Sequence, residues 1–262
     1  MTAPRADRPI FLDHAASAPL DPRVAARMCE CLRDPALQAN PSSAHGPGRA
    51  AATIVAQARA QVAALIGAEP AAIVFTAGAT ESVNLAVLGA TRAAPAGHRH
   101  IVTARTEHRA GIESCRELER EGCHFTWLHP GPGGCVSPEQ VAAALRPDTA
   151  LVSLLHANNE IGVLQDIAAI AGLCNERGVP LHADAAQSVG RIPVDVGALG
   201  VALLSFCAHK LGGPKGVGAL YVRRRPRPAL RPLVFGGGQE AGLRSGTLAT
   251  HQLAGFGLAC EL

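Results

Sequence analysis

Apolar stretches and helical stretches alternate along most of this chain, and this alternation limits its possible folds more than any other feature. Candidate strands fall at 72–76, 100–104, 124–128, 150–155, 180–183 and 201–206, and helical patterns lie between them at 79–92, 109–121, 137–146 and 164–177. Strand and helix in repeated succession build a parallel sheet that is covered by helices on both faces. The sequence therefore predicts an α/β fold with a largely parallel sheet.

The segments outside this alternation complete the expected fold. Residues 9–20 resemble an extended arm, and helices are predicted at 22–32 and 49–66 with a loop between them. The apolar run at 218–223 follows Lys210 too closely for a helical crossover, so we expect it to pair antiparallel with its neighbour. A last helix begins at Gln252 and has no cap or glycine before the chain stops, which predicts truncation inside that helix.

The overall composition is that of a soluble globular protein, with 48% hydrophobic and 17% charged residues. A net charge of +3 is too small to indicate nucleic-acid binding. The sequence has no apolar run long enough to predict a membrane span, and its first residues lack the apolar core of a signal peptide. We therefore predict a cytoplasmic protein without nucleic-acid or membrane partners.

Cysteine and histidine spacing gives no sign of a metal centre. The eight cysteines include no C-x-x-C pair, and the eleven histidines include no H-x-x-x-H or H-E-x-x-H pattern. We therefore predict no metal site and no disulfide framework. His98 and His100 are expected at the surface.

The stretch from Ser205 to Gly218 follows an apolar strand and then breaks into a glycine-rich turn. Of the 24 basic residues in the chain only two are lysine, and both, Lys210 and Lys215, lie in this stretch. A desolvated lysine can lose its proton and form a Schiff base, whereas arginine cannot. Composition and spacing alone leave open that these are two lysines in a turn with no special role.

Two further strand ends carry groups suited to a phosphorylated cofactor. The segment 73–82 reads as strand, glycine turn and helix start, where free amides and the Thr80 hydroxyl can hold a phosphate. The alternative is an ordinary turn in which Thr80 caps the helix. Asp184 ends another strand, where it could pair with a pyridinium nitrogen or cap a helix.

His108 and Asn159 each follow a strand as well. A histidine at such a place can stack on a ring or move protons, although a lone histidine is more often a surface residue. Together, five strand ends offer a cradle, a histidine, an amide, a carboxylate and a lysine. This set fits a cofactor with a phosphate, a ring cation and an aldehyde, so we expect pyridoxal phosphate in preference to a bare phosphate ligand.

Six ordered motifs carry a resemblance to a known family. They are Thr-Ala-Gly-Ala-Thr-Glu-Ser (76–82), Thr-Glu-His (106–108), Asn-Asn-Glu-Ile-Gly-Val (158–163), His-Ala-Asp-Ala-Ala-Gln-Ser-Val-Gly (182–190), His-Lys-x-x-Gly-Pro-Lys-Gly (209–216) and Gly-Gly-Gly-Gln-Glu with Arg-Ser-Gly-Thr (236–247). From about residue 10 to 262 the chain resembles the cysteine desulfurases, which are class V, fold-type I pyridoxal phosphate enzymes. The resemblance implies a cofactor-binding large domain at 21–262, an arm at 1–20 that belongs to the small domain, and a C-terminal small domain missing from this chain.

The resemblance also implies roles for single residues. Lys210 resembles the Schiff-base lysine, Asp184 the partner of the pyridine nitrogen, and His108 the histidine that stacks on the ring and transfers protons. The other matched positions are Asn159 and Gln187 near the ring hydroxyl, Ala79, Thr80, Cys207 and His209 at the phosphate, and Thr247, which reaches the phosphate of a neighbouring subunit in a homodimer.

The implied reaction converts L-cysteine to L-alanine and leaves the sulfur as a persulfide on an enzyme cysteine. The sulfur then passes to an acceptor or scaffold protein for iron–sulfur cluster or thio-cofactor synthesis. No cysteine here matches the family's persulfide-forming residue. Cys207 stands where serine is usual at the phosphate, so we expect a weak hydrogen-bond donor there and disfavour a role as the persulfide-forming cysteine. The alternatives are a selenocysteine lyase, another class V pyridoxal phosphate enzyme, or a non-catalytic remnant that binds the cofactor.

Overall fold

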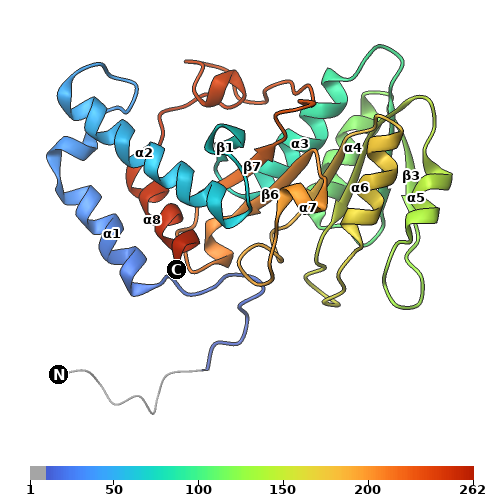
Figure 1. Cartoon of the computed structure of the whole chain (residues 1–262), viewed down its shortest axis with the longest axis horizontal. Helices are drawn as coiled ribbons and strands as arrows, with labels where there is room; N and C mark the ends of the chain where they lie inside the picture. Colours follow the sequence, from blue (N-terminus) through green and yellow to red (C-terminus); the bar gives the residue numbers. More distant parts are fainter. Residues whose placement is uncertain (1–9) are drawn as a thin grey trace.

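The computed structural model describes residues 10–262 and has a seven-stranded sheet at its centre (Figure 1). The sheet order is β1-β7-β6-β5-β4-β2-β3. The strands are β1 (Ile73–Thr76), β2 (His100–Ala104), β3 (His124–Leu128), β4 (Thr149–Leu155), β5 (Leu181–Asp184), β6 (Leu203–Cys207) and β7 (Gly218–Val222). Each predicted strand is confirmed to within two residues at either end.

Five strands run parallel, and β7 is antiparallel to both of its neighbours. The prediction that the run after Lys210 pairs antiparallel is therefore confirmed, with Gly218 opposite Cys207 in the register. Because β7 reverses direction between β6 and β1, β1 points the same way as the parallel strands. The carboxyl ends of six strands consequently lie along one edge of the sheet, which is where open α/β sheets bind ligands.

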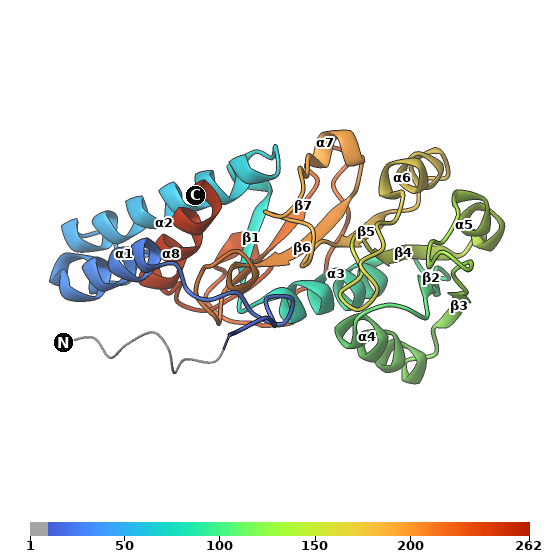
Figure 2. The same cartoon turned by 90° about the horizontal axis from the view of Figure 1, so that it is seen from below.

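Helices cover both faces of the sheet (Figure 2). They are α1 (Pro22–Arg33), α2 (Gly46–Leu65), α3 (Ala79–Ala93), α4 (Arg109–Arg120), α5 (Pro138–Ala144), α6 (Ile167–Glu176), α7 (Val196–Leu199) and α8 (Thr250–Glu261). Single turns of 3-10 helix occur at η2 (Pro35–Gln38), η3 (Pro70–Ala72), η4 (Ala208–Lys210) and η5 (Glu240–Gly242). The mostly parallel sheet with helices on both faces is as predicted.

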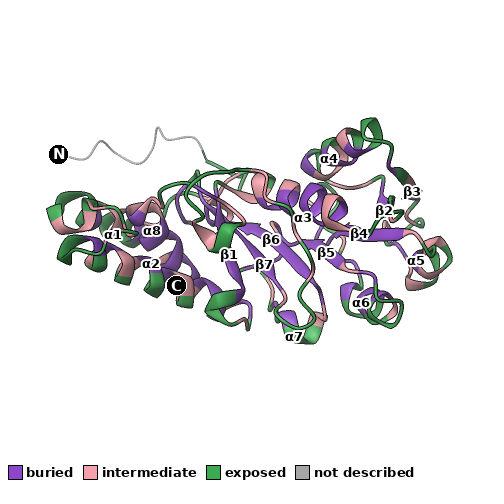
Figure 3. Ribbon diagram, turned by 90° about the horizontal axis from the view of Figure 1, so that it is seen from above, coloured by how far each residue is buried: buried purple, intermediate pink, exposed green. Residues whose placement is uncertain are grey.

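The alternation of strand side chains produces two hydrophobic cores, one on each face. Val74, Ile101, Leu151 and Leu203 belong to the core that includes α3 and α4. The residue after each of them belongs to the opposite core, which includes α2, α6 and α8; these residues are Phe75, Val102, Val152 and Leu204. Every residue of β4 through β7 is buried, as the purple strands of Figure 3 show. This two-sided burial fixes the strand ends that carry the polar groups.

Two predictions about the polar residues and helix starts are wrong. His100 is fully buried rather than at the surface, because it begins β2 and bridges the hydroxyls of Thr149 and Thr126, each at 2.9 Å. Helix α2 begins three residues earlier than predicted, at Gly46. There the His45 ring accepts a hydrogen bond from the Gly48 N–H at 3.2 Å, and proline near the start of a helix is favourable.

The extended arm packs against the segment that carries Lys210. The Ala18 N–H donates to the His209 carbonyl and the Asp21 N–H to the Gly212 carbonyl, both at 2.9 Å. These bonds place the arm over the carboxyl edge of the sheet. Among residues 10–262, no helix combines the length and the apolar character that crossing a membrane requires.

Candidate active site

A cavity of about 1190 Å³ opens at the carboxyl edge of the sheet. Nine of the ten residues predicted for the site line it, and they come from α3, the β2–α4 and β4–α6 connections, and the ends of β5 and β6. They are Ala79, Thr80, His108, Asn159, Asp184, Gln187, Cys207, His209 and Lys210. The tenth, Thr247, is exposed and lies outside this cavity. Nine residues that were predicted from separate motifs therefore line one cavity in the fold.

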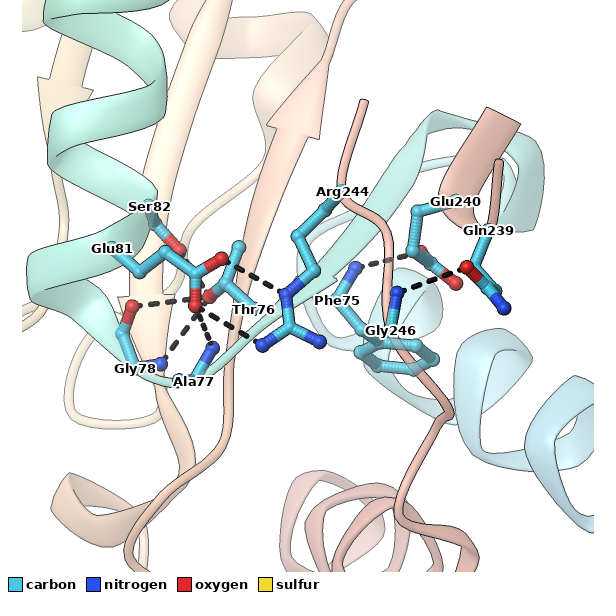
Figure 4. Close-up of polar contacts among 10 residues, drawn as sticks. All are labelled: Phe75, Thr76, Ala77, Gly78, Glu81, Ser82, Gln239, Glu240, Arg244 and Gly246. Atoms are coloured by element: carbon cyan, nitrogen blue, oxygen red, sulfur yellow. Dashed lines mark hydrogen bonds and ion pairs between the residues drawn. The ribbon is translucent and has the colours of Figure 1, made fainter. Parts of the chain in front are cut away.

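The turn between β1 and α3 has the geometry of an anion cradle. Gly78 is the N-cap with φ of 153°, and its position supplies no side-chain cap. Among residues 10–262 the N–H groups of Ala79 and Thr80 have no oxygen or nitrogen acceptor, and the Ala79 N–H has only the weak acceptor Cys207 Sγ beside it. Both residues line the cavity at a helix N-terminus, where such groups can bind an anion. The alternative in which Thr80 caps the helix is wrong. Thr76 and Ser82 brace the turn through a 2.7 Å bond between their hydroxyls (Figure 4).

Asp184 presents one free carboxylate oxygen to the cavity. The residue is 6% exposed, and its Oδ1 accepts a hydrogen bond from the Ala186 N–H at 3.0 Å. That bond closes a local turn rather than capping a helix. Oδ2 has no hydrogen-bond partner in the described part of the chain. Burial raises the pKa of this carboxyl group, so a cation at Oδ2 would favour its ionised form.

Lys210 ends the single turn η4 directly after β6. Its Nζ donates a hydrogen bond to the carbonyl of Ala15 in the arm. Partial burial is the main cause that lowers the pKa of the Lys210 amine. A lowered pKa increases the share of neutral amine, which is the form that reacts with an aldehyde.

Three further polar residues, His108, Asn159 and Gln187, line the same cavity as this lysine. His108 is the N-cap of α4, and its Nδ1 accepts a hydrogen bond from the Ala110 N–H at 3.1 Å, which leaves its other ring nitrogen available. Asn159 lines the cavity, whereas its neighbour Asn158 is a structural residue that bonds the Thr106 carbonyl at 3.0 Å. Gln187 donates from Nε2 to the Ala15 carbonyl at 2.9 Å.

Three atoms of the cavity wall are buried without a hydrogen-bond partner: Ser17 Oγ, Gln187 Oε1 and His209 Nδ1. Buried polar atoms in proteins nearly always have partners, so a cluster of exceptions indicates a ligand that supplies them. Burial lowers the pKa of His209, which keeps this imidazole neutral and able to accept or donate.

Cys207 lies at the end of β6 and is 1% exposed. Burial raises the pKa of its thiol to about 11. The reactive form of cysteine is the thiolate, so this residue is poorly suited to be a nucleophile. In the cavity wall, Cys207 can pack against its neighbours or form a weak hydrogen bond.

Sequence reasoning did not identify every residue of this region. Asp13, Ala15 and Ser17 of the arm line the cavity, and so does Glu81 in the first turn of α3. Glu81 in turn pairs with Arg244, 163 residues later in the chain. Both residues lie within the family motifs, but no local pattern connects two positions so far apart.

The fold and this cavity together define a class of protein. The chain matches the family described as Aminotransferase class-V over residues 10–262, and it belongs to that family. The predicted fold class, the large domain of fold-type I pyridoxal phosphate enzymes, is confirmed by the sheet and by solved relatives.

Individual relatives narrow the class. The protein named cysteine desulfurase IscS from Aeromonas hydrophila subsp. hydrophila is 56% identical over 255 residues, which are 97% of this chain and 63% of that protein. The protein of the same name from Azotobacter vinelandii is 53% identical over the same shares. A solved structure described as SspA in complex with cysteine superposes with a TM-score of 0.91 at 42% identity, covering 96% of this chain and 72% of the other. The chain thus spans 63% of the length of these curated relatives.

Pyridoxal 5'-phosphate is the cofactor of this family, and the cavity residues fit it. The free amides at the start of α3 suit its phosphate, the open oxygen of Asp184 suits its ring nitrogen, and the amine of Lys210 suits its aldehyde. The unpartnered atoms of Gln187 and His209 are further groups that this ligand could satisfy.

Proposed function

We propose that this chain is the cofactor-binding part of a pyridoxal phosphate-dependent cysteine desulfurase. Such an enzyme converts L-cysteine to L-alanine and passes the sulfur to an enzyme cysteine. One observation carries the proposal: Lys210, Asp184 and the start of α3 meet in one cavity of a chain more than half identical to proteins named cysteine desulfurase. A structural relative described in complex with cysteine supports the choice of substrate.

The cofactor, when bound, supplies an aldehyde that bonds amines and a cationic ring that withdraws electrons from the adjacent carbon. The residues of this chain provide the rest. Asp184 would hold a ring-nitrogen cation through its open oxygen, since a buried carboxylate is stabilised by a cation beside it. The amides of Ala79 and Thr80 would hold the phosphate at the other end of the cofactor.

Lys210 has two tasks in this proposal. Its amine would hold the cofactor through the aldehyde, and Nζ would move the proton at the substrate Cα. Burial lowers the pKa of Lys210 and so raises the share of neutral amine that both tasks require. His108, fixed by its cap bond to Ala110, offers a second ring nitrogen for stacking and for proton transfer at the departing sulfur.

Further parts of the proposal follow from the family. Asn159 and Gln187 are assigned to the ring hydroxyl, and Cys207 and His209 to the phosphate. Thr247 is assigned to the phosphate of a second copy in a homodimer, which agrees with its exposure outside the cavity of its own chain. Residues 1–20 are assigned to the small domain and 21–262 to the large domain. The proposal also includes a partner protein, either a sulfur acceptor or an iron–sulfur scaffold, and a cytoplasmic location.

The test begins with cofactor attachment. The purified chain is titrated with pyridoxal phosphate, reduced with borohydride, digested and analysed by mass spectrometry. We expect the cofactor mass on the Lys210 peptide. Lys210→Ala should lose it, and Lys215→Ala, which removes the only other lysine, should keep it. Alanine release from L-cysteine and from L-selenocysteine is then measured with a thiol present.

The possible results separate the candidate functions. Attachment at Lys210 with alanine formed from L-cysteine supports the desulfurase, whereas alanine formed only from L-selenocysteine supports a selenocysteine lyase. Attachment without turnover of either substrate supports a non-catalytic cofactor-binding protein. A wild-type chain that takes up no cofactor, or takes it up equally in Lys210→Ala, contradicts the proposed role of Lys210.

A further inference from the structure

A carboxylate lies at the edge of the phosphate cradle. Glu81 is in the first turn of α3, lines the same cavity as Ala79 and Thr80, and has a side chain that is 20% exposed. Its Oε2 accepts a hydrogen bond from the Ala77 N–H at 2.6 Å. This bond holds the first residue of the cradle turn in place (Figure 4).

The same carboxylate opposes the function proposed for the cradle. A helix N-terminus attracts one negative group, and a carboxylate in the first turn already satisfies that preference. A phosphate that arrives beside it carries up to two negative charges, and like charges in a partly buried site repel strongly. The cradle can therefore bind a phosphate well only if the charge of Glu81 is balanced.

Arg244 supplies this balance. Its Nε donates to Glu81 Oε1 at 2.9 Å and its Nη2 to Oε2 at 3.5 Å, so the guanidinium faces both carboxylate oxygens. The two side chains are only 23% and 20% exposed, so solvent screens the pair less than it screens an ion pair on the surface. The pair holds the carboxylate on the side of the turn where Ala77 lies.

The loop that carries Arg244 is itself fixed. Glu240 accepts hydrogen bonds from the Phe75 N–H at 2.7 Å and from Arg59 at 2.8 Å, and it adopts a positive φ of 53°. The Gln239 side chain accepts a bond from the Gly246 N–H at 2.9 Å. The contacts with Phe75 and Gly246 are drawn in Figure 4, and together with the Arg59 bond they fix the loop on both sides of Arg244. Arg244 thus needs little reordering to meet Glu81.

We infer that Arg244 is a positioning residue for phosphate binding: it neutralises Glu81 and so lets the cradle bind a phosphate while Glu81 keeps the turn in shape. The inference rests on the proposed function, because the phosphate belongs to the proposed cofactor. It assigns to Arg244 an action through Glu81, with no contact to the ligand required.

The experiment compares pyridoxal phosphate with pyridoxal, which lacks the phosphate. Dissociation constants of both are measured by absorbance titration at pH about 8, where the phosphate is doubly charged. Arg244→Met should weaken pyridoxal phosphate binding by about tenfold or more and leave pyridoxal binding unchanged. Adding Glu81→Gln should restore most of the lost affinity, since no charge is then left unbalanced. Arg120→Met, which removes an exposed arginine paired with Glu117, is the matched control.

Each result bears on the inference. An equal loss of affinity for both ligands in Arg244→Met would show a general structural role and overturn it. So would an unchanged affinity for pyridoxal phosphate, or a double variant no better than the single one. If the wild-type chain binds neither ligand, the proposed function fails first and this inference fails with it. A wild-type chain that binds the cofactor while its variants behave alike refutes the inference alone.

Discussion

Gly218 at the start of β7 packs against the backbone of Gly78 in the cradle turn. A methyl group built on Gly218 would lie 2.6 Å from the carbonyl carbon of Gly78 and 2.8 Å from the Phe206 carbonyl oxygen. Both obstacles are backbone atoms, which cannot move aside as a flexible side chain can. The strand that follows Lys210 therefore determines how closely the cradle turn approaches the sheet.

Gly218→Ala should displace the cradle turn. We expect a loss of about 1–3 kcal/mol in the free energy of unfolding, as for other overpacked sites, together with weaker binding of pyridoxal phosphate. Urea unfolding and absorbance titration measure the two effects. Gly172→Ala in α6 is the control, because its added methyl meets no atom within 4 Å. That change should stabilise the helix by about 0.5–1 kcal/mol. Equal behaviour of the two variants would contradict the steric role of Gly218.

Lys210 should react as an amine at lower pH than an ordinary lysine, because burial lowers its pKa. In Lys215→Arg it is the only lysine left, so acetylation of Lys210 can be followed by mass spectrometry as a function of pH. The neutral amine is the reactive form, so the labelling rate should rise and level off with a midpoint below the ordinary value of 10.5. A short synthetic peptide with one lysine provides the reference for intrinsic reactivity. A midpoint for Lys210 at or above that of the peptide would contradict the prediction.

Much of the fold and most of the site could be predicted from local patterns. Parallel strands end at a common edge, so polar residues that follow apolar runs, such as Asp184 and Lys210, had to meet there. The pairing of Glu81 with Arg244 could not be predicted, since it depends on where a long loop returns to the sheet. The strand order that places β7 between β1 and β6 depends on the same long-range packing.

The burial of His100 could not be predicted from its own segment. Histidine is intermediate in its tendency to be buried, and His100 was expected at the surface. In the structure both of its ring nitrogens meet hydroxyls on the flanking strands, which removes the penalty of burial. The local sequence contains the histidine, but the hydroxyl partners Thr126 and Thr149 come from other strands. The same arrangement recurs at His182.

Glu240 should be the most sensitive position of the loop before α8. Its side chain is 1% exposed and bonds both Arg59 and the Phe75 N–H. Glu240→Ala leaves these donors without their acceptor, so we expect a loss of about 3–5 kcal/mol in the free energy of unfolding. Urea unfolding gives the value. Glu117→Ala removes an exposed pair with Arg120 and should change stability by less than about 1 kcal/mol. Similar small losses in both would show that the buried pair is not a major support of the loop.

His182 lies inside the sheet between Ser153 and Ser205, with each ring nitrogen 2.8 Å from a hydroxyl. Burial lowers its pKa from 6.5 to about 3. Between these values the unfolded chain binds a proton that the folded chain excludes, so this residue's contribution to stability is complete above pH 6.5 and is lost as the pH falls toward 3. The expected slope from this group is about 1.4 kcal/mol per pH unit.

His182→Gln keeps an amide between the two serines but cannot titrate. The free energy of unfolding should therefore fall more steeply with acid in the wild type than in the variant, even though buried carboxyl groups such as Asp184 titrate in both. Denaturant unfolding at several pH values tests this, and parallel curves for the two proteins would contradict a neutral, buried His182.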